Sequence, residues 1–135
     1  MSSSLEQLHA ERAAFVKRYE DSQRELSQIR EDLKARQDQL SALEERKGAA
    51  QEQLSKVIGL IKDTESKRAL VGPELTARLM GPLEIERRSL QSEAQRVEAD
   101  LVKAHAAAAE VAQKLGPAFQ QQQRFQEVLL SLIHI

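Results

Sequence analysis

The sequence contains no cysteine and no tryptophan, and its aromatic residues are one tyrosine and three phenylalanines. The lack of cysteine excludes disulfides, thiolate metal ligands and thiol nucleophiles within these residues, and it is compatible with a cytoplasmic location. So few aromatic side chains leave little bulky apolar material for a compact core. The composition therefore argues against an ordinary globular domain.

An excess of charge of one sign is also lacking. Lys and Arg number 20 against 21 Asp and Glu, which gives a net charge of -1. The two signs are mixed along the chain, so there is no basic footprint for a nucleic acid. No apolar run approaches the ~20 residues of a membrane-spanning helix, and the residues after Met1 do not resemble a signal peptide. We expect no nucleic-acid partner and no membrane insertion.

Motifs for catalysis or ligand binding are missing as well. His9, His105 and His134 lie far apart, and none has a partner at a metal-binding spacing. There is no phosphate loop, no dinucleotide-binding motif and no nucleophile elbow. Glu44 and Glu45 would lie exposed on an extended helix, which lacks the buried setting that acid–base catalysis requires. We therefore predict no enzyme, catalytic residue, metal site, cofactor or small-molecule substrate.

What the chain does contain is a heptad pattern from residue 5 to 61, with apolar residues at alternating steps of three and four. This spacing keeps the contact line of two supercoiled helices in register. A second, thinner ladder runs from residue 83 to 132. Together these positions form a seam, which we predict to bind a partner helix. Its members are Leu5, Leu8, Phe15, Tyr19, Leu26, Ile29, Leu33, Leu40, Leu43, Leu54, Val57, Ile61, Leu90, Val97, Leu101, Val111 and Leu115.

Three cations interrupt the apolar seam: Arg12, Arg36 and Lys47. A cation at a seam position weakens association, but it also penalises wrong registers and wrong partners. These residues are therefore candidates for selecting the register or the partner. The alternative is that their long side chains merely reach past the seam to water.

Three Gly-Pro steps punctuate the second half: Gly72-Pro73, Gly81-Pro82 and Gly116-Pro117. Proline lacks a backbone N–H and disfavours helical geometry in the residue before it, so each step predicts a joint. The expected division is a long helix at 5–70, a joint with a short helical turn at 71–82, a second helix at 83–115 and a short helix at 116–131. The overall prediction is an all-α fold of long coiled-coil helices without a compact globular core. Both a hairpin and an extended jointed rod satisfy the pattern.

The end of the chain, residues 129–135, is apolar on nearly every face. This is expected either of the cut edge of a longer helix or of a few residues foreign to the natural protein. Residues 132–135 are therefore kept out of the functional assignment.

The segment after the third Gly-Pro step holds Phe119, Gln121 and Phe125, which form a candidate docking patch. The run Gly116, Pro117, Phe119, Gln121, Phe125 and Glu127 resembles a motif near the C-terminal end of the larger coiled-coil subunit of the intraflagellar transport B complex. That family has Trp where this chain has Phe125, and it lacks the first two Gly-Pro steps.

The resemblance implies a scaffold segment that pairs with a second coiled-coil subunit as a heterodimer during cilium assembly. It extends the expected location to the cilium or flagellum, among cytoskeletal proteins. Two alternatives stay open. One is a helical-hairpin stalk protein similar to those of bacterial flagellar and type III export systems, and the other is a generic coiled-coil spacer. We predict a non-enzymatic protein–protein interaction with another coiled-coil protein, as a hetero- or homodimer. The stalk alternative instead favours an antiparallel pair within one chain.

Overall fold

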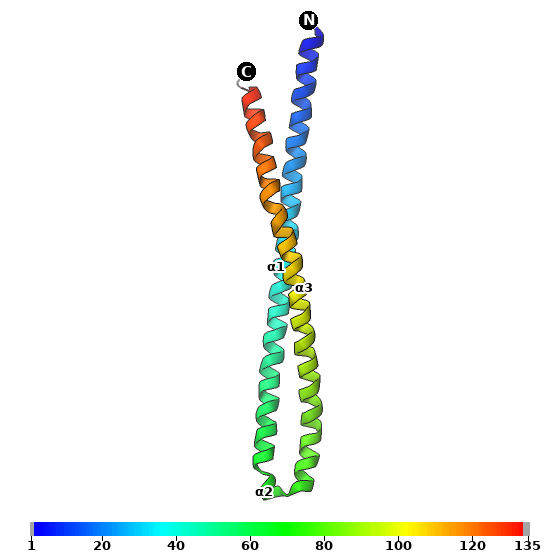
Figure 1. Cartoon of the computed structure of the whole chain (residues 1–135), viewed down its shortest axis with the longest axis vertical. Helices are drawn as coiled ribbons and strands as arrows, with labels where there is room; N and C mark the ends of the chain where they lie inside the picture. The colour runs from blue at the N-terminus through cyan, green and yellow to red at the C-terminus, as the bar shows by residue number, and fades with distance from the viewer. Residues whose placement is uncertain (1, 134–135) are drawn as a thin grey trace. The chain divides into compact units, whose positions relative to one another are not determined.

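The structure is a computed structural model that describes the backbone of residues 2–133 and the side chains of residues 4–132. It contains three helices: α1 spans Ser2–Ser66, α2 spans Arg68–Val71 and α3 spans Pro73–Ile133 (Figure 1). No strand occurs among residues 2–133. The predicted all-α fold is confirmed. His134 and Ile135, which belong to the segment 132–135 that received no functional assignment, lie outside the described residues.

The long helices follow from the local sequence. Between Ser2 and Ser66 there is no proline, and Gly48 and Gly59 are the only glycines. The rest is rich in Leu, Ala, Glu, Gln, Arg and Lys, the residues with the highest helix propensity. Most of the stability of such helices must come from packing, because propensity alone sustains only marginal helices in water.

Two of the predicted joints are wrong, because α3 continues through both Gly81-Pro82 and Gly116-Pro117. A proline inside a helix removes one hydrogen bond from the carbonyl four residues earlier. Pro82 and Pro117 are both exposed, and so are the residues four positions before them. Water can therefore reach the carbonyl that each proline leaves without a donor. The expected helices at 83–115 and 116–131 are one helix.

The remaining predicted joint is narrower than 71–82 and centres on Gly72. The first helix ends at Ser66 instead of residue 70, and the four-residue α2 follows. Gly72 has φ 87° and ψ 162°, a region that is essentially restricted to glycine. Its N–H donates to the Arg68 carbonyl at 2.9 Å and ends α2.

The same glycine starts α3. The Gly72 carbonyl accepts the N–H of Thr76 at 3.2 Å and the hydroxyl of Thr76 at 2.8 Å. Pro73 occupies the first helical position, where its missing N–H costs nothing and its fixed φ suits a helix. The turn is therefore built by contacts within residues 68–76.

The chain divides into two compact units. Unit 2, Asp38–His105, is a helical hairpin in which the end of α1 leads through α2 into the start of α3 (Figure 1). Unit 1 combines the residues up to Gln37 with those from Ala106 onward. Within unit 1 the two helical segments run antiparallel, since Arg12 contacts Leu132 whereas Ile29 shares a cleft with Val111.

Burial in both units follows the predicted ladders. The buried hydrophobic residues all lie at ladder positions; they are Leu26, Leu43, Ala50, Val57, Val97, Leu101, Ala104, Val111 and Ala118. In unit 2, Leu43, Val97, Leu101 and Ala104 form one cluster, with Leu40 packed against it. Each unit therefore has a line of buried side chains between two helices.

We predict opposite responses to the same substitution at two glycines. Gly72→Ala should lower the free energy of unfolding by about 1 to 3 kcal/mol, because a Cβ is strained at this backbone geometry. Gly81→Ala, within α3, should raise it by about 0.5 to 1 kcal/mol. A Cβ added at either site would meet no heavy atom within 4 Å, so the backbone alone decides the difference. Urea unfolding measures both, and equal effects would contradict the assigned turn.

A second comparison tests the buried line in unit 2. Val97 is 0% exposed, whereas Val102, five residues later in α3, is 64% exposed. Val97→Ala should lower the free energy of unfolding by about 1 to 2 kcal/mol through lost burial. Val102→Ala should be neutral or slightly stabilising, because alanine has the higher helix propensity. Thermal or urea unfolding of both variants is the measurement, and a Val102 effect as large as the Val97 effect would argue against this packing.

Candidate interaction surfaces

Most of the predicted seam residues are buried or half-buried within their own unit. Within unit 1, Leu26 and Val111 are buried and Phe15, Tyr19, Ile29, Leu33 and Leu115 are half-buried. Within unit 2, Leu43, Val57, Val97 and Leu101 are buried and Leu40, Leu54, Ile61 and Leu90 are half-buried. Leu5 and Leu8 differ from the rest, since both are exposed. The seam thus places α1 against α3 in each unit.

Lys47 is the seam cation with the closest partner on the other helix. Its Nζ lies 2.8 Å from Oε2 of Glu98 on α3. The hydrogen bond and the charge of Glu98 raise the pKa of Lys47 above its ordinary value of 10.5, with a smaller contribution from Glu44, while burial opposes the shift. Nearby, Arg46 Nη2 lies 3.2 Å from Glu93 Oε1. These two ion pairs link α1 to α3 within unit 2.

The other two seam cations are placed differently. Arg36 Nε lies 3.6 Å from Asp32 Oδ1, one turn earlier in the same helix. Arg12 is exposed, and its Nη2 donates to the Leu132 carbonyl at 3.4 Å. Neither contact is short, and only the Arg12 contact reaches the other helix. Selection of the register or the partner by Arg12, Arg36 and Lys47 stays a prediction.

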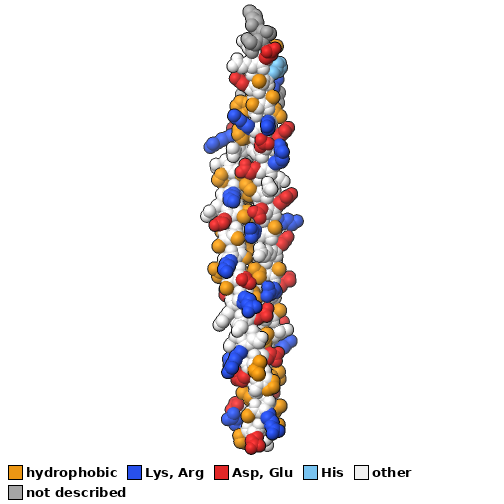
Figure 2. Space-filling view, turned by 90° about the vertical axis from the view of Figure 1, so that its right-hand side faces the viewer, with side chains coloured by type: hydrophobic (Ala, Val, Ile, Leu, Met, Phe, Trp, Pro, Cys, Tyr) orange, Lys and Arg blue, Asp and Glu red, His pale blue; other side chains and the backbone are white. Residues whose placement is uncertain are grey.

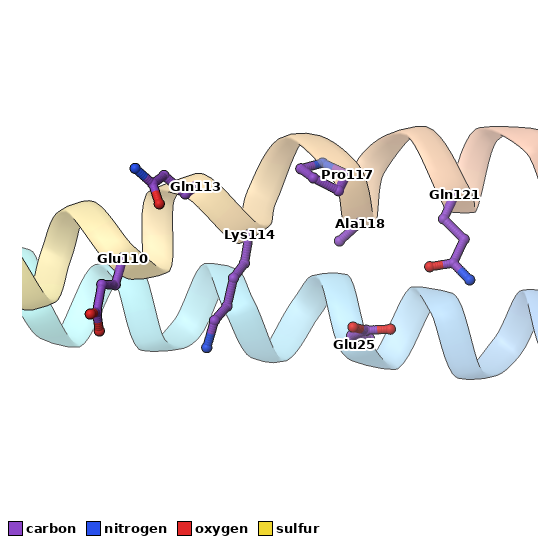
Figure 3. Close-up of a pocket in the computed structure, with 7 residues that line it drawn as sticks. All are labelled: Glu25, Glu110, Gln113, Lys114, Pro117, Ala118 and Gln121. Atoms are coloured by element: carbon purple, nitrogen blue, oxygen red, sulfur yellow. The ribbon is translucent and has the colours of Figure 1, made fainter.

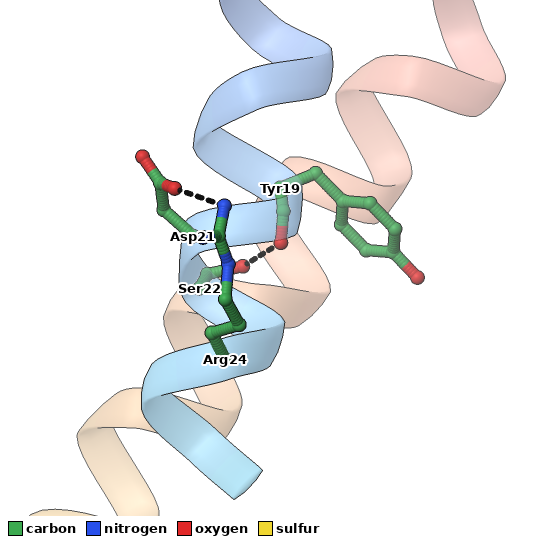
Figure 4. Close-up of polar contacts among 4 residues, drawn as sticks. All are labelled: Tyr19, Asp21, Ser22 and Arg24. Atoms are coloured by element: carbon green, nitrogen blue, oxygen red, sulfur yellow. Dashed lines mark hydrogen bonds and ion pairs between the residues drawn. The ribbon is translucent and has the colours of Figure 1, made fainter. Parts of the chain in front are cut away.

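A polar residue also occupies the buried line in unit 1. Ser22 is buried, and its hydroxyl donates to the Tyr19 carbonyl at 2.7 Å (Figure 4). The Tyr19 hydroxyl accepts a hydrogen bond from Gln23 Nε2 at 2.9 Å. On the surface of the same turn, Arg24 pairs with Asp21 at 2.9 Å (Figure 4). The buried Ser22 hydroxyl is therefore satisfied by a carbonyl of α1 itself and needs no group from another helix or another protein.

The candidate docking patch is only partly assembled. Gln121 and Phe125 line a cleft of about 310 Å³ in unit 1, together with Ser22 and other residues of α1. Phe119 is 41% exposed but does not line this cleft. The structure thus brings together two of the three predicted residues.

An adjacent cleft of about 430 Å³ shares Gln121. The residues that line it are Glu25, Glu110, Gln113, Lys114, Pro117, Ala118 and Gln121 (Figure 3). Glu25 comes from α1, and Lys114 extends from α3 toward that helix (Figure 3). This lining offers carboxylates, amides and an ammonium group, but no hydroxyl, thiol or imidazole.

Sequence reasoning missed a group of exposed apolar residues around α2. We call this group the tip patch: Leu60, Leu70, Val71, Leu75 and Leu79. These residues lie off the heptad ladder, so a search for periodic positions passes over them. The available signal was the high density of leucine around Gly72-Pro73. A cavity of about 210 Å³ opens here, lined by Leu60, Asp63, Thr64, Lys67, Val71 and Leu79.

Charged side chains of both signs are interspersed on the face that Figure 2 shows. Residues 4–132 contain no group of three or more His, Asp or Glu side chains placed to hold a metal ion. None of the described helices is both long and apolar enough to cross a bilayer.

Comparison with protein-family models, curated proteins and solved structures finds no match.

The Lys47–Glu98 pair predicts a loss of stability at alkaline pH. Because the folded state raises the pKa of Lys47 above 10.5, the contribution of the pair is complete below that pH and is lost as the pH rises through the raised value. Lys47→Leu should remove this part of the pH dependence, and it should raise the melting temperature near neutral pH, because Leu fits an apolar seam. Thermal unfolding from about pH 8 to about pH 12 tests both statements. Identical alkaline profiles of the two proteins would show that the pair contributes nothing.

Proposed function

We propose that this chain is a non-enzymatic, antiparallel coiled-coil hairpin that serves as a structural arm and carries its binding surfaces outside the seam. The observation that supports this proposal most directly is the burial pattern. In both units, the heptad positions of α1 and the ladder positions of α3 are the sites at which hydrophobic side chains become buried. The chain thereby supplies the companion helix that its own seam requires.

The energetics favour this arrangement over an isolated extended helix. Full burial of a Leu, Ile, Val or Phe side chain contributes ~1.5 to 3 kcal/mol, but only if something covers it. In unit 2, Leu43 of α1 and Leu101 of α3 obtain this cover within one buried cluster. The hairpin needs no second chain to stabilise its helices.

A closed seam also changes where a partner would bind. The seam residues were predicted to bind another coiled coil, and that would require α1 and α3 to separate. A partner of the closed hairpin would instead meet its outer faces. The tip patch and the clefts around Gln121 are among the surfaces that remain available.

The within-chain pairing supports the hairpin-stalk and spacer alternatives over an intermolecular rod. Assembly with a partner coiled-coil subunit of the intraflagellar transport B complex, at the cilium, stays a prediction that depends on the Gly116–Glu127 resemblance. Phe119 is exposed and Phe125 is half-buried, so both are accessible to a partner on the outer face of unit 1. That mode of assembly is compatible with a closed seam.

Distance measurement between two spin labels tests the hairpin. The chain has no cysteine, so Arg46→Cys with Glu93→Cys provides two unique sites. Both side chains are about half exposed, and they form an ion pair at 3.2 Å, so labels there should lie close together without disturbing the buried line. The short distance should persist when the doubly labelled chain is diluted with about a tenfold excess of unlabelled chain.

The matched control is an equimolar mixture of the two singly labelled chains. A hairpin predicts no short distance in this mixture, because both labels must reside on one chain. A short distance in the mixture, together with its loss on dilution of the double variant, would show that the helices pair between chains and would overturn the proposal.

A further inference from the structure

We propose that the tip patch is a self-association site, at which two copies of the chain meet around a two-fold axis and Leu70 of each copy enters the tip cavity of the other. The proposal concerns unit 2 alone and rests on its hairpin. It goes beyond the structural arm by giving the exposed end of unit 2 one defined occupant.

The apolar character of the tip provides the first argument. Leu70 is 85% exposed, and Leu60, Val71, Leu75 and Leu79 are between 41% and 52% exposed. Apolar side chains reach the surface among the charged ones near the lower end of the view in Figure 2, where α2 lies. Single exposed leucines are ordinary, but several around one short turn are typical of a contact surface.

The cavity beside Leu70 provides the second argument. Leu60, Val71 and Leu79 supply its apolar wall. Its volume of about 210 Å³ lies below the roughly 300 to 1,000 Å³ of typical small-molecule pockets. It is suited instead to one apolar side chain that enters as a knob into a hole. Leu70 is such a knob, and it does not line the cavity of its own chain.

The charged side chains that line the tip cavity, which we call its rim, favour one kind of binding partner over others. Asp63 and Lys67 both line the cavity, and their own contact is long, at 3.9 Å, with both side chains more than 60% exposed. A rim with one acid and one base is complementary to itself, because a two-fold axis can bring Asp63 of one copy to Lys67 of the other. Arg68 is paired with Glu65 at 3.3 Å. The bases beside the turn are thus partly neutralised, which weakens any attraction to an anionic lipid surface.

The small extent of the surface sets the expected strength. Five apolar residues per copy are far fewer than the roughly 20 to 30 residues on each side of a standard interface. We therefore expect weak association, with a dissociation constant on the order of 100 micromolar. Such a contact would join hairpins tip to tip only where their local concentration is high.

Sedimentation over a concentration series of the full chain tests the proposal. The unaltered chain should shift from monomer to dimer as its concentration passes through that range, and Leu70→Ser should remain monomeric throughout. Ile85→Ser is the matched control, because Ile85 is also strongly exposed, at 69%, but lies outside the tip patch. This variant should dimerise like the unaltered chain. A chain that stays monomeric at all concentrations, or equal association of the two variants, would overturn the proposal.

The rim charges give a second readout. Lys67→Glu alone and Asp63→Lys alone should each weaken dimerisation, since each leaves two like charges on the rim. An equimolar mixture of these two variants should associate more strongly than either variant by itself, because the copies then carry opposite rims. No gain in the mixture would rule out the two-fold pairing of Asp63 with Lys67.

Two further results separate this proposal from its alternatives. If the distance between the spin labels at positions 46 and 93 stays short while the chain is monomeric, the hairpin holds and only the tip contact fails. Loss of that distance would instead mean that the hairpin itself is wrong. Binding of a monomeric chain to vesicles that contain anionic lipid, abolished by Leu70→Ser, would assign the tip to a membrane surface and overturn the self-association site.

Discussion

The burial of one line of side chains on α1 against one line on α3 is the interaction on which both units depend. The two lines differ in size. In unit 2, Leu40 packs against the cluster that contains Ala104, and in unit 1 the buried Leu26 and Ala118 come from the two helices. Small residues such as Ala104 and Ala118 thus lie on the buried line of α3, together with the larger Val97, Leu101 and Val111. Few aromatic residues are needed for such a narrow contact.

Polar groups along this line are tolerated because each finds a partner. The Ser22 hydroxyl bonds to its own helix, and Lys47 meets Glu98 on the other. Such groups add less stability than an apolar residue of similar size. That Lys47 also selects the register, because a shifted pairing would leave the cation facing an apolar neighbour, stays a prediction. Gly72 sets the turn that allows the two helices to meet, since its backbone geometry is open essentially to glycine alone.

The helical class and the buried positions could be predicted because burial on a paired helix repeats with the heptad. Whether the seam pairs within the chain or with a second chain could not be predicted, since a heptad seam fits a helix from either source. Gly81-Pro82 and Gly116-Pro117 misled the prediction because local geometry does not reveal whether water can reach the freed carbonyl. The docking patch stays a prediction, although Phe119 does not line the cleft that Gln121 and Phe125 share. The tip patch was missed because its leucines lie off the repeat.

The central claim is that α1 and α3 pair within one chain. The most direct test is the melting temperature, followed by circular dichroism, at chain concentrations from about 0.1 to about 10 micromolar, below the range expected for tip association. Pairing within the chain predicts the same melting temperature throughout, because unfolding then involves one molecule. A melting temperature that rises steadily with concentration would show that the helices are held together by a second chain, and it would contradict the account.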